Sequence, residues 1–103
     1  MVSFTRGEIG FLKECYVLHK KDGYISPFDH FDLSENLQES LFSSAFKKLT
    51  SNFLFEPLNP QEASVLLMAI HHVSKDYIID EIDFDLRTVY NKVASIAGVD
   101  PLE

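Results

Sequence analysis

Apolar residues recur at helical spacing in four stretches of the chain, near residues 5–20, 35–53, 60–75 and 85–97. In each stretch they stand three or four positions apart, which places their side chains on one face of a helix. These stripes exist only at the helical period and not at the two-residue period of a strand. The pattern therefore predicts an all-α fold, a small array of four helices in a single domain that covers residues 1–103.

Capping residues mark the start of three of these helices. Thr5 and Glu8 form a Thr-x-x-Glu capping box, in which the hydroxyl and the carboxylate each accept a hydrogen bond from a free backbone amide. Ser34 is a preferred cap for the second helix, and Asn59 followed by Pro60 is a preferred start for the third. Local sequence alone therefore predicts where these helices begin.

The helices differ in how much of their surface is apolar. The stripe of the first helix contains Ile9, Leu12, Tyr16 and His19, flanked by Phe11, Cys15 and Leu18. The stripe of the second contains Leu37, Leu41, Ala45 and Leu49, widened by Phe42, Phe46 and Phe53. The third helix is apolar nearly all round, so we expect it to be the central helix, with Leu66, Leu67 and Ile70 in the core.

Turn residues mark where the helices end. Asp22-Gly23 supplies a turn after the first helix, and Gly98 followed by Pro101 ends the fourth. Between the third and fourth helices, residues 76–85 contain no Gly or Pro but several Asp, which favour turns and caps. The sequence predicts a break there, and one continuous helix is the alternative.

The composition favours one well-packed core in a soluble protein. Of the 103 residues, 46% are hydrophobic and nine are Phe, which is enough apolar area to order the chain. The longest apolar run, residues 65–70, is too short to cross a bilayer, and the first residues lack the apolar core of an export signal. Cys15 is the single cysteine, so we expect no internal disulfide and a reducing, cytoplasmic location.

The charge of the chain is strongly negative. Sixteen acidic residues against nine basic ones give a formal net charge of −7 at pH 7. A field of that sign repels phosphate backbones, so direct nucleic-acid binding is not expected, whereas a basic protein surface is attracted. In size, acidity and helical content the chain resembles bacteriocin immunity proteins and phage-encoded inhibitors, and this resemblance implies an inhibitor or regulator of another protein.

The candidate metal sites do not have adequate ligands. Asp22-Gly23 is similar to the middle of an EF-hand calcium loop, but that register places Lys20 at a ligand position. His71 and His72 point about 100° apart on a helix and do not form a zinc-protease motif. The serines and the lone cysteine stand in no nucleophile pattern. We therefore expect no catalytic residue, no metal and no cofactor, and a protein that is not an enzyme.

Residues 93–101, Val-Ala-Ser-Ile-Ala-Gly-Val-Asp-Pro, resemble the opening of the helix-turn-helix in repressors of the lactose-repressor family. That resemblance implies a recognition helix that follows at once and reads the major groove. Only two residues follow in the chain, and its net charge opposes DNA, so we expect a Gly-capped helix end instead.

An acidic segment with interleaved apolar side chains, residues 76–85, is the candidate partner-binding site. Charge steers the encounter with a basic surface, while aromatic or aliphatic groups that become buried supply affinity. The expected contact residues are Asp76, Tyr77, Asp80, Glu81, Asp83, Phe84 and Asp85. The alternative is a solvated connection whose apolar residues close one end of the core.

The sequence thus predicts a non-enzymatic protein-binding module that regulates or inhibits a partner protein with a basic surface. One alternative is a DNA mimic that blocks a nucleic-acid-binding enzyme, which requires carboxylates in a continuous band at intervals of about 7 Å. The other is a helical domain that binds a small ligand or a metal, which requires a pocket with converging polar groups.

Overall fold

The computed structural model describes residues 4–23, 34–50, 58–81 and 84–99. Within these ranges the chain contains no strand and forms the helices α1 (Arg6–Lys21), α2 (Glu35–Thr50), α3 (Pro60–Asp76) and α4 (Leu86–Ala97). The all-α prediction is confirmed, and the helix bounds agree with the predicted ones to within about one residue, apart from the end of α2, where the prediction runs on to residue 53 and residues 51–57 are not described. Phe53, which the apolar pattern predicts on the second helix, lies outside the described residues. None of the described helices has the length and apolar character needed to cross a membrane.

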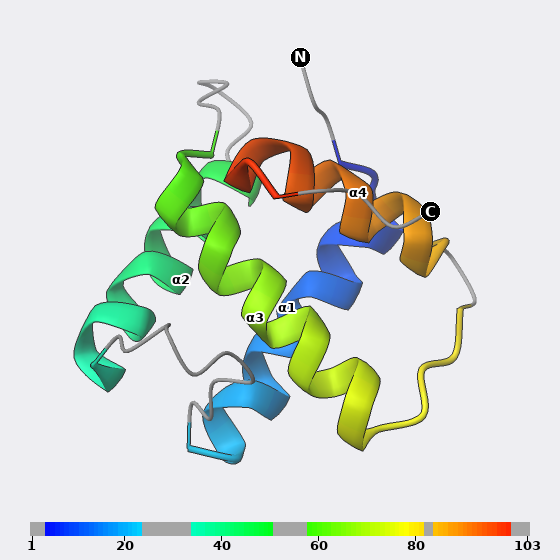
Figure 1. Ribbon diagram of the computed structural model, residues 1–103, viewed down its shortest axis with the longest axis horizontal. Helices are drawn as coiled ribbons and strands as arrows, with labels where there is room; N and C mark the ends of the chain where they lie inside the picture. Colours follow the sequence, from blue (N-terminus) through cyan, green and yellow to red (C-terminus); the bar gives the residue numbers. More distant parts are fainter. Residues whose placement is uncertain (1–3, 24–33, 51–57, 82–83, 100–103) are drawn as a thin grey trace.

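The third helix is the central one, as predicted. In Figure 1, α3 crosses the middle of the molecule, with α1 behind it and α2 and α4 on either side. It packs against each of the other three helices. Leu66, Leu67 and Ile70 are buried in the core together with apolar side chains of α1, α2 and α4. The nearly continuous apolar surface of α3 is therefore explained by contact with neighbours on several sides.

The predicted helix starts are confirmed by their capping hydrogen bonds. Thr5 Oγ1 accepts from the Glu8 amide at 3.2 Å, and Glu8 Oε1 accepts from the Thr5 amide at 2.7 Å. Asn59 and Glu62 exchange the same pair of bonds at the start of α3, both at 2.8 Å. Ser34 Oγ accepts from an amide in the first turn of α2 at 3.2 Å. These bonds satisfy backbone donors that have no partner within the helix.

The helix ends also follow the predicted turn residues. Gly98 ends α4 with a φ of 77°, a left-handed conformation that glycine adopts without steric strain. Asp22 caps α1, and Gly23 follows with a φ of 83°. α3 stops at Asp76 because Tyr77 is extended, with φ −130° and ψ 154°. The break between the third and fourth helices is therefore confirmed, and the alternative of one continuous helix is wrong.

The predicted inward face of α2 is wrong at one end. Leu37, expected on the buried stripe, is 45% exposed, whereas Gln38, Phe42 and Ala45 are buried. A four-residue repeat turns by about 40° at each step, so the ends of a long stripe move off the face. Gln38 is held inside because its Oε1 lies 3.0 Å from His19 Nε2 on α1. The buried face is set by this polar pair as well as by the apolar residues.

Two buried carboxylates join elements that are distant in the sequence. Glu8 accepts two hydrogen bonds from Lys92 Nζ on α4, at 2.6 and 2.9 Å. Glu62 accepts from Lys48 Nζ on α2 at 2.8 Å and also from the Ser44 hydroxyl. Both glutamates are capping residues as well, so each one stabilises a helix start and a contact between helices.

These contacts shift the pKa values of the two glutamates. Burial by itself raises the pKa of Glu8, but the hydrogen bonds from Lys92 and from the Thr5 backbone outweigh it and lower the pKa below the ordinary 4.5. Glu62 shows the same balance, with its pKa lowered by the bonds to Asn59, Lys48 and Ser44. Burial on its own lowers the pKa of His71, and it is also the main cause of the lowered pKa of His19.

The free energy of unfolding should therefore fall in two stages as the solution is acidified. His19 and His71 favour the neutral form in the folded state, so unfolding takes up protons and stability declines below their ordinary pKa of 6.5. The charged forms of Glu8 and Glu62 contribute fully to the stability of the fold above pH 4.5, the ordinary pKa of a glutamate. This contribution is lost as the pH falls through their lower pKa values in the folded state. Urea midpoints measured from pH 8 to pH 3 test this. A midpoint that stays constant across that range would contradict it.

Candidate functional site

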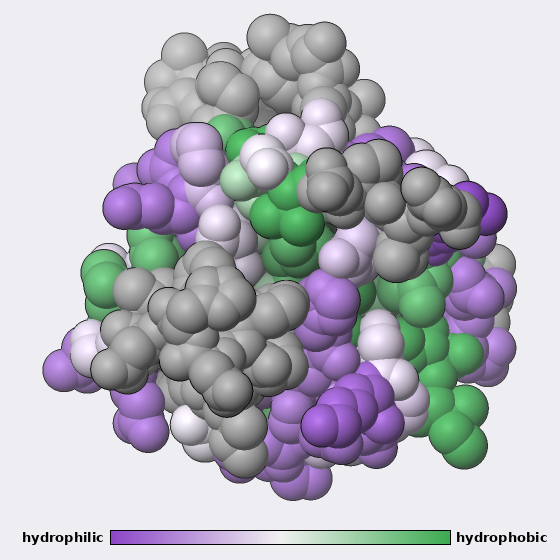
Figure 2. All heavy atoms as spheres, in the orientation of Figure 1, coloured by the Kyte–Doolittle hydropathy of each residue, from purple (hydrophilic) through white to green (hydrophobic). Residues whose placement is uncertain are grey.

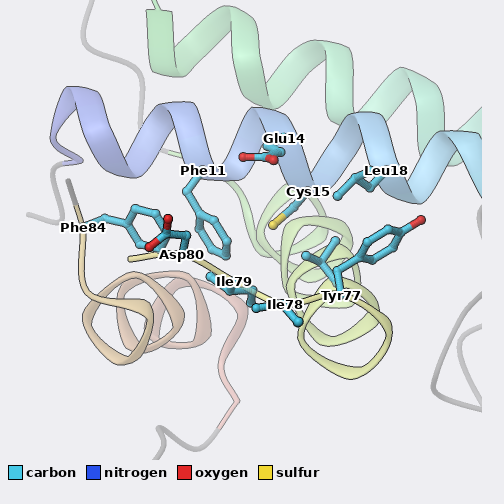
Figure 3. Close-up of a pocket in the computed structure, with 10 residues that line it drawn as sticks. Phe11, Glu14, Cys15, Leu18, Tyr77, Ile78, Ile79, Asp80 and Phe84 are labelled. Atoms are coloured by element: carbon cyan, nitrogen blue, oxygen red, sulfur yellow. The ribbon is translucent and has the colours of Figure 1, made fainter. Parts of the chain in front are cut away.

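The segment that joins α3 to α4, residues 77–85, forms one wall of a groove. We call this segment the α3–α4 connection; residues 82 and 83 in it lie outside the described residues. Its Phe84 ring stacks on the Phe11 ring of α1, with 4.3 Å between the ring centroids. Ile79 is packed against the core. These contacts hold the connection beside α1, as Figure 3 shows.

The groove between α1 and the α3–α4 connection has a volume of about 370 Å³. Figure 3 shows Phe11 and Cys15 pointing from α1 toward the part of the chain that carries Ile78 and Ile79. Most of the residues that line it are apolar or aromatic, namely Phe11, Cys15, Leu18, Val73, Tyr77, Ile78, Ile79 and Phe84, and they are joined by Glu14 and Asp80. This volume is at the lower end of the range of about 300–1,000 Å³ typical of ligand pockets, so the groove can take a single large apolar group.

Two carboxylates, one from each wall, make the groove acidic. Glu14 belongs to α1 and Asp80 to the α3–α4 connection, and both residues are exposed. Neither forms an ion pair or a side-chain hydrogen bond within the described part of the chain. An apolar group with a cation beside it is complementary to this combination of lining and charge.

Ile78 is the most exposed large apolar side chain of the described residues, at 101% of its reference area. It lines the groove from the α3–α4 connection. Figure 2 shows hydrophobic atoms gathered over the part of the chain that follows α3, with hydrophilic atoms beside them. Burying such a side chain completely contributes about 1.5–3 kcal/mol, which the isolated chain does not gain.

A polar cluster fixes the start of the connection. Asp22 Oδ2 accepts from His72 Nε2 and from the Tyr77 hydroxyl, both at 2.7 Å. The bonds from His72 and Tyr77 lower the pKa of Asp22, and the bond to Asp22 raises the pKa of Tyr77. Because Tyr77 also lines the groove, this cluster ties the end of α1 to one wall of it.

The six predicted contact residues that the structure describes fall into two groups. Tyr77, Asp80 and Phe84 line the groove. Asp76, Glu81 and Asp85 are exposed. Glu81 accepts from the Leu86 amide at 2.6 Å and Asp85 from the Thr88 hydroxyl at 2.7 Å, while Asp76 lies 3.3 Å from His72 Nδ1, with which it pairs when the imidazole is protonated. Asp83 lies outside the described residues. Asp80 is therefore the described acid of this segment whose charge is most available to a partner.

The sequence prediction missed the wall that α1 contributes. Phe11, Cys15 and Leu18 stand at positions i, i+4 and i+7, so they form a second apolar line beside the main stripe of α1. The spacing of these three residues predicts that they are buried, but it does not predict a groove. The groove depends on the position of the α3–α4 connection, which is set by the stacking of Phe84 on Phe11 and by the hydrogen bond from Tyr77 to Asp22.

No family model, curated protein or solved structure matches this chain. Its function is therefore inferred from the groove, from the charge around it and from the exposed side chain next to it.

The other candidate sites are the possible metal ligands and the Cys15 thiol. Within residues 4–23, 34–50, 58–81 and 84–99, no three His, Cys, Asp or Glu side chains are arranged to hold a metal ion. His30 lies outside these ranges. Burial, followed by the nearby charge of Glu14, raises the pKa of the Cys15 thiol well above its ordinary value. A protonated, buried thiol is a poor nucleophile, so Cys15 acts here as an apolar part of the groove.

Proposed function

We propose that this protein is a non-enzymatic protein-binding module that regulates or inhibits a partner protein through the α3–α4 connection and the groove beside it. The observation that carries the proposal is the complete exposure of Ile78 next to an apolar groove. A fully exposed aliphatic side chain that adjoins other apolar surface supports this role, because it gains free energy when a partner covers it.

The partner we propose has a basic surface. The chain carries a net charge of −7, and Asp80 and Glu14 place acidic groups at the groove itself. Complementary charge accelerates the encounter, while the apolar anchor slows dissociation. We expect the complex to form without nucleic acid or membrane, in a reducing compartment such as the cytoplasm, where a free cysteine persists. A small inhibitor or immunity-type protein of a bacterium or phage fits this description.

A pull-down with matched variants tests the proposal. Replacing Ile78 with Ser should weaken binding of the recovered partner about 10- to 100-fold, because the burial of about 1.5–3 kcal/mol is lost. Leu37→Ser is the matched control, since Leu37 is also an exposed apolar residue but lies on α2, away from the groove. The partner should bind this control as it binds the wild type.

The contribution of charge to partner binding is tested with a second pair of variants. Asp80→Asn should slow association at low salt and flatten its salt dependence, whereas Glu35→Gln, an equal change of charge on exposed α2 surface, should have a smaller effect. Surface plasmon resonance at two salt concentrations measures both. If the partner binds Ile78→Ser with unchanged affinity, its binding surface lies elsewhere and the proposal fails.

A further inference from the structure

We infer that the groove between α1 and the α3–α4 connection receives one apolar side chain from a short basic peptide segment, whose neighbouring Lys or Arg side chains lie on Glu14 and Asp80. This inference rests on the proposed function and names the chemistry of the partner at the same site. It concerns the groove itself, whereas the proposed function depends first on the exposed Ile78.

The interior of the groove favours an apolar group of limited size. Side chains of Phe11, Cys15 and Leu18 form the α1 wall, and Ile79 and Phe84 lie opposite. The volume of about 370 Å³ suits one large aliphatic or aromatic side chain rather than an entire helix face. The raised pKa of Cys15 keeps the thiol uncharged, so it adds no charge to this apolar lining.

The charge at the groove selects a cation beside that apolar group. Glu14 and Asp80 come from the two opposite walls, so a segment lying across the groove passes close to both. Neither carboxylate is paired within the part of the chain that the structure describes. Lys and Arg can lay their aliphatic stems along apolar surface while their charged ends reach the carboxylates.

The same charges disfavour other occupants. A fatty acid would place its own carboxylate near Glu14 and Asp80, and like charges in a partly desolvated site repel. A neutral apolar molecule would fill the groove but gain nothing from the two carboxylates, which are exposed and would stay hydrated. A peptide with one apolar anchor and adjacent basic residues satisfies the lining and the charge together.

Selection from a random dodecapeptide phage library against the immobilised full chain tests this inference. Enriched peptides should carry Leu, Ile, Phe or Trp with Lys or Arg within two positions. Synthetic fluorescein-labelled copies are then titrated by fluorescence anisotropy at low and at high salt. Binding to the wild type should weaken at high salt, because the contacts with Glu14 and Asp80 are exposed to solvent.

Variants of the groove separate its interior from its charge. Leu18→Trp should fill the groove and weaken peptide binding more than tenfold, while Leu37→Trp on α2 should leave it unchanged. The double variant Glu14→Gln/Asp80→Asn, which alters only exposed side chains, should weaken binding about tenfold and remove most of its salt dependence. This second variant keeps the inference testable if Leu18→Trp does not fold.

The outcomes distinguish the inference from the proposed function. Peptides without basic residues, no enrichment, or unchanged binding to both Leu18→Trp and the double variant would overturn the groove inference. Dodecanol serves as the neutral apolar probe. If it bound the groove more tightly than any selected peptide, the groove inference would also be overturned, in favour of a neutral small ligand. Peptides or partners that depend on Ile78 but not on Leu18 would overturn it while leaving the proposed function in place.

Discussion

Replacing Glu62 with Ala is expected to lower the free energy of unfolding by about 3–5 kcal/mol, the usual effect of removing one member of a buried ion pair. The Glu62 side chain is only 1% exposed and has three kinds of partner. It accepts hydrogen bonds from the Asn59 backbone amide, from Lys48 and from the Ser44 hydroxyl. Removing the carboxylate leaves the partly buried Lys48 ammonium without its partner and the Asn59 backbone amide without its acceptor.

Glu39→Ala is the matched control for Glu62→Ala. Glu39 also pairs with a lysine at 2.8 Å, but in its pair with Lys20 the side chains are 49% and 51% exposed. An exposed ion pair of this kind contributes at most about 1 kcal/mol. Urea unfolding followed by circular dichroism at pH 7 measures both variants. If both variants lost the same free energy of unfolding, the buried ion pair of Glu62 would not be what holds α2 to α3.

A second large effect is expected for Phe42→Ala, which should destabilise the protein by about 3–5 kcal/mol through lost burial and a residual cavity. Phe42 is fully buried on α2. Its ring lies 4.7 Å from that of Tyr16 and 5.9 Å from that of His19, measured between centroids, so it is one of the apolar links between α1 and α2, beside the contact of Phe46 with Tyr16. Few direct contacts join these two helices, which makes the link difficult to replace.

Leu37→Ala provides the comparison on the same helix. Leu37 stands on the predicted stripe but is 45% exposed, so its truncation should change the free energy of unfolding by only about 0.5 kcal/mol. Thermal and urea unfolding of the two α2 variants check the difference. If Leu37→Ala were as destabilising as Phe42→Ala, the inward face of α2 would be the one predicted from the four-residue repeat.

The four helices and most of their limits are predictable from the amino-acid sequence. Thr5, Asn59 and Gly98 act on backbone groups within three or four residues of themselves, so their effect can be recognised without the fold. The central position of α3 was also predictable, because only a helix with neighbours on several sides can bury an apolar surface that is nearly continuous. These are local or compositional properties.

The identity of the buried polar side chains and the position of the groove depend instead on how the helices pack together. Glu8 meets Lys92 and Asp22 meets His72 across 84 and 50 residues of sequence. Such pairs depend on how helices pack, and periodicity within one helix does not report the position of another. The α3–α4 connection was predicted as an acidic, apolar segment, but its placement against α1 follows from long-range contacts of Phe84 and Tyr77. A groove is formed by two elements together, so neither one predicts it alone.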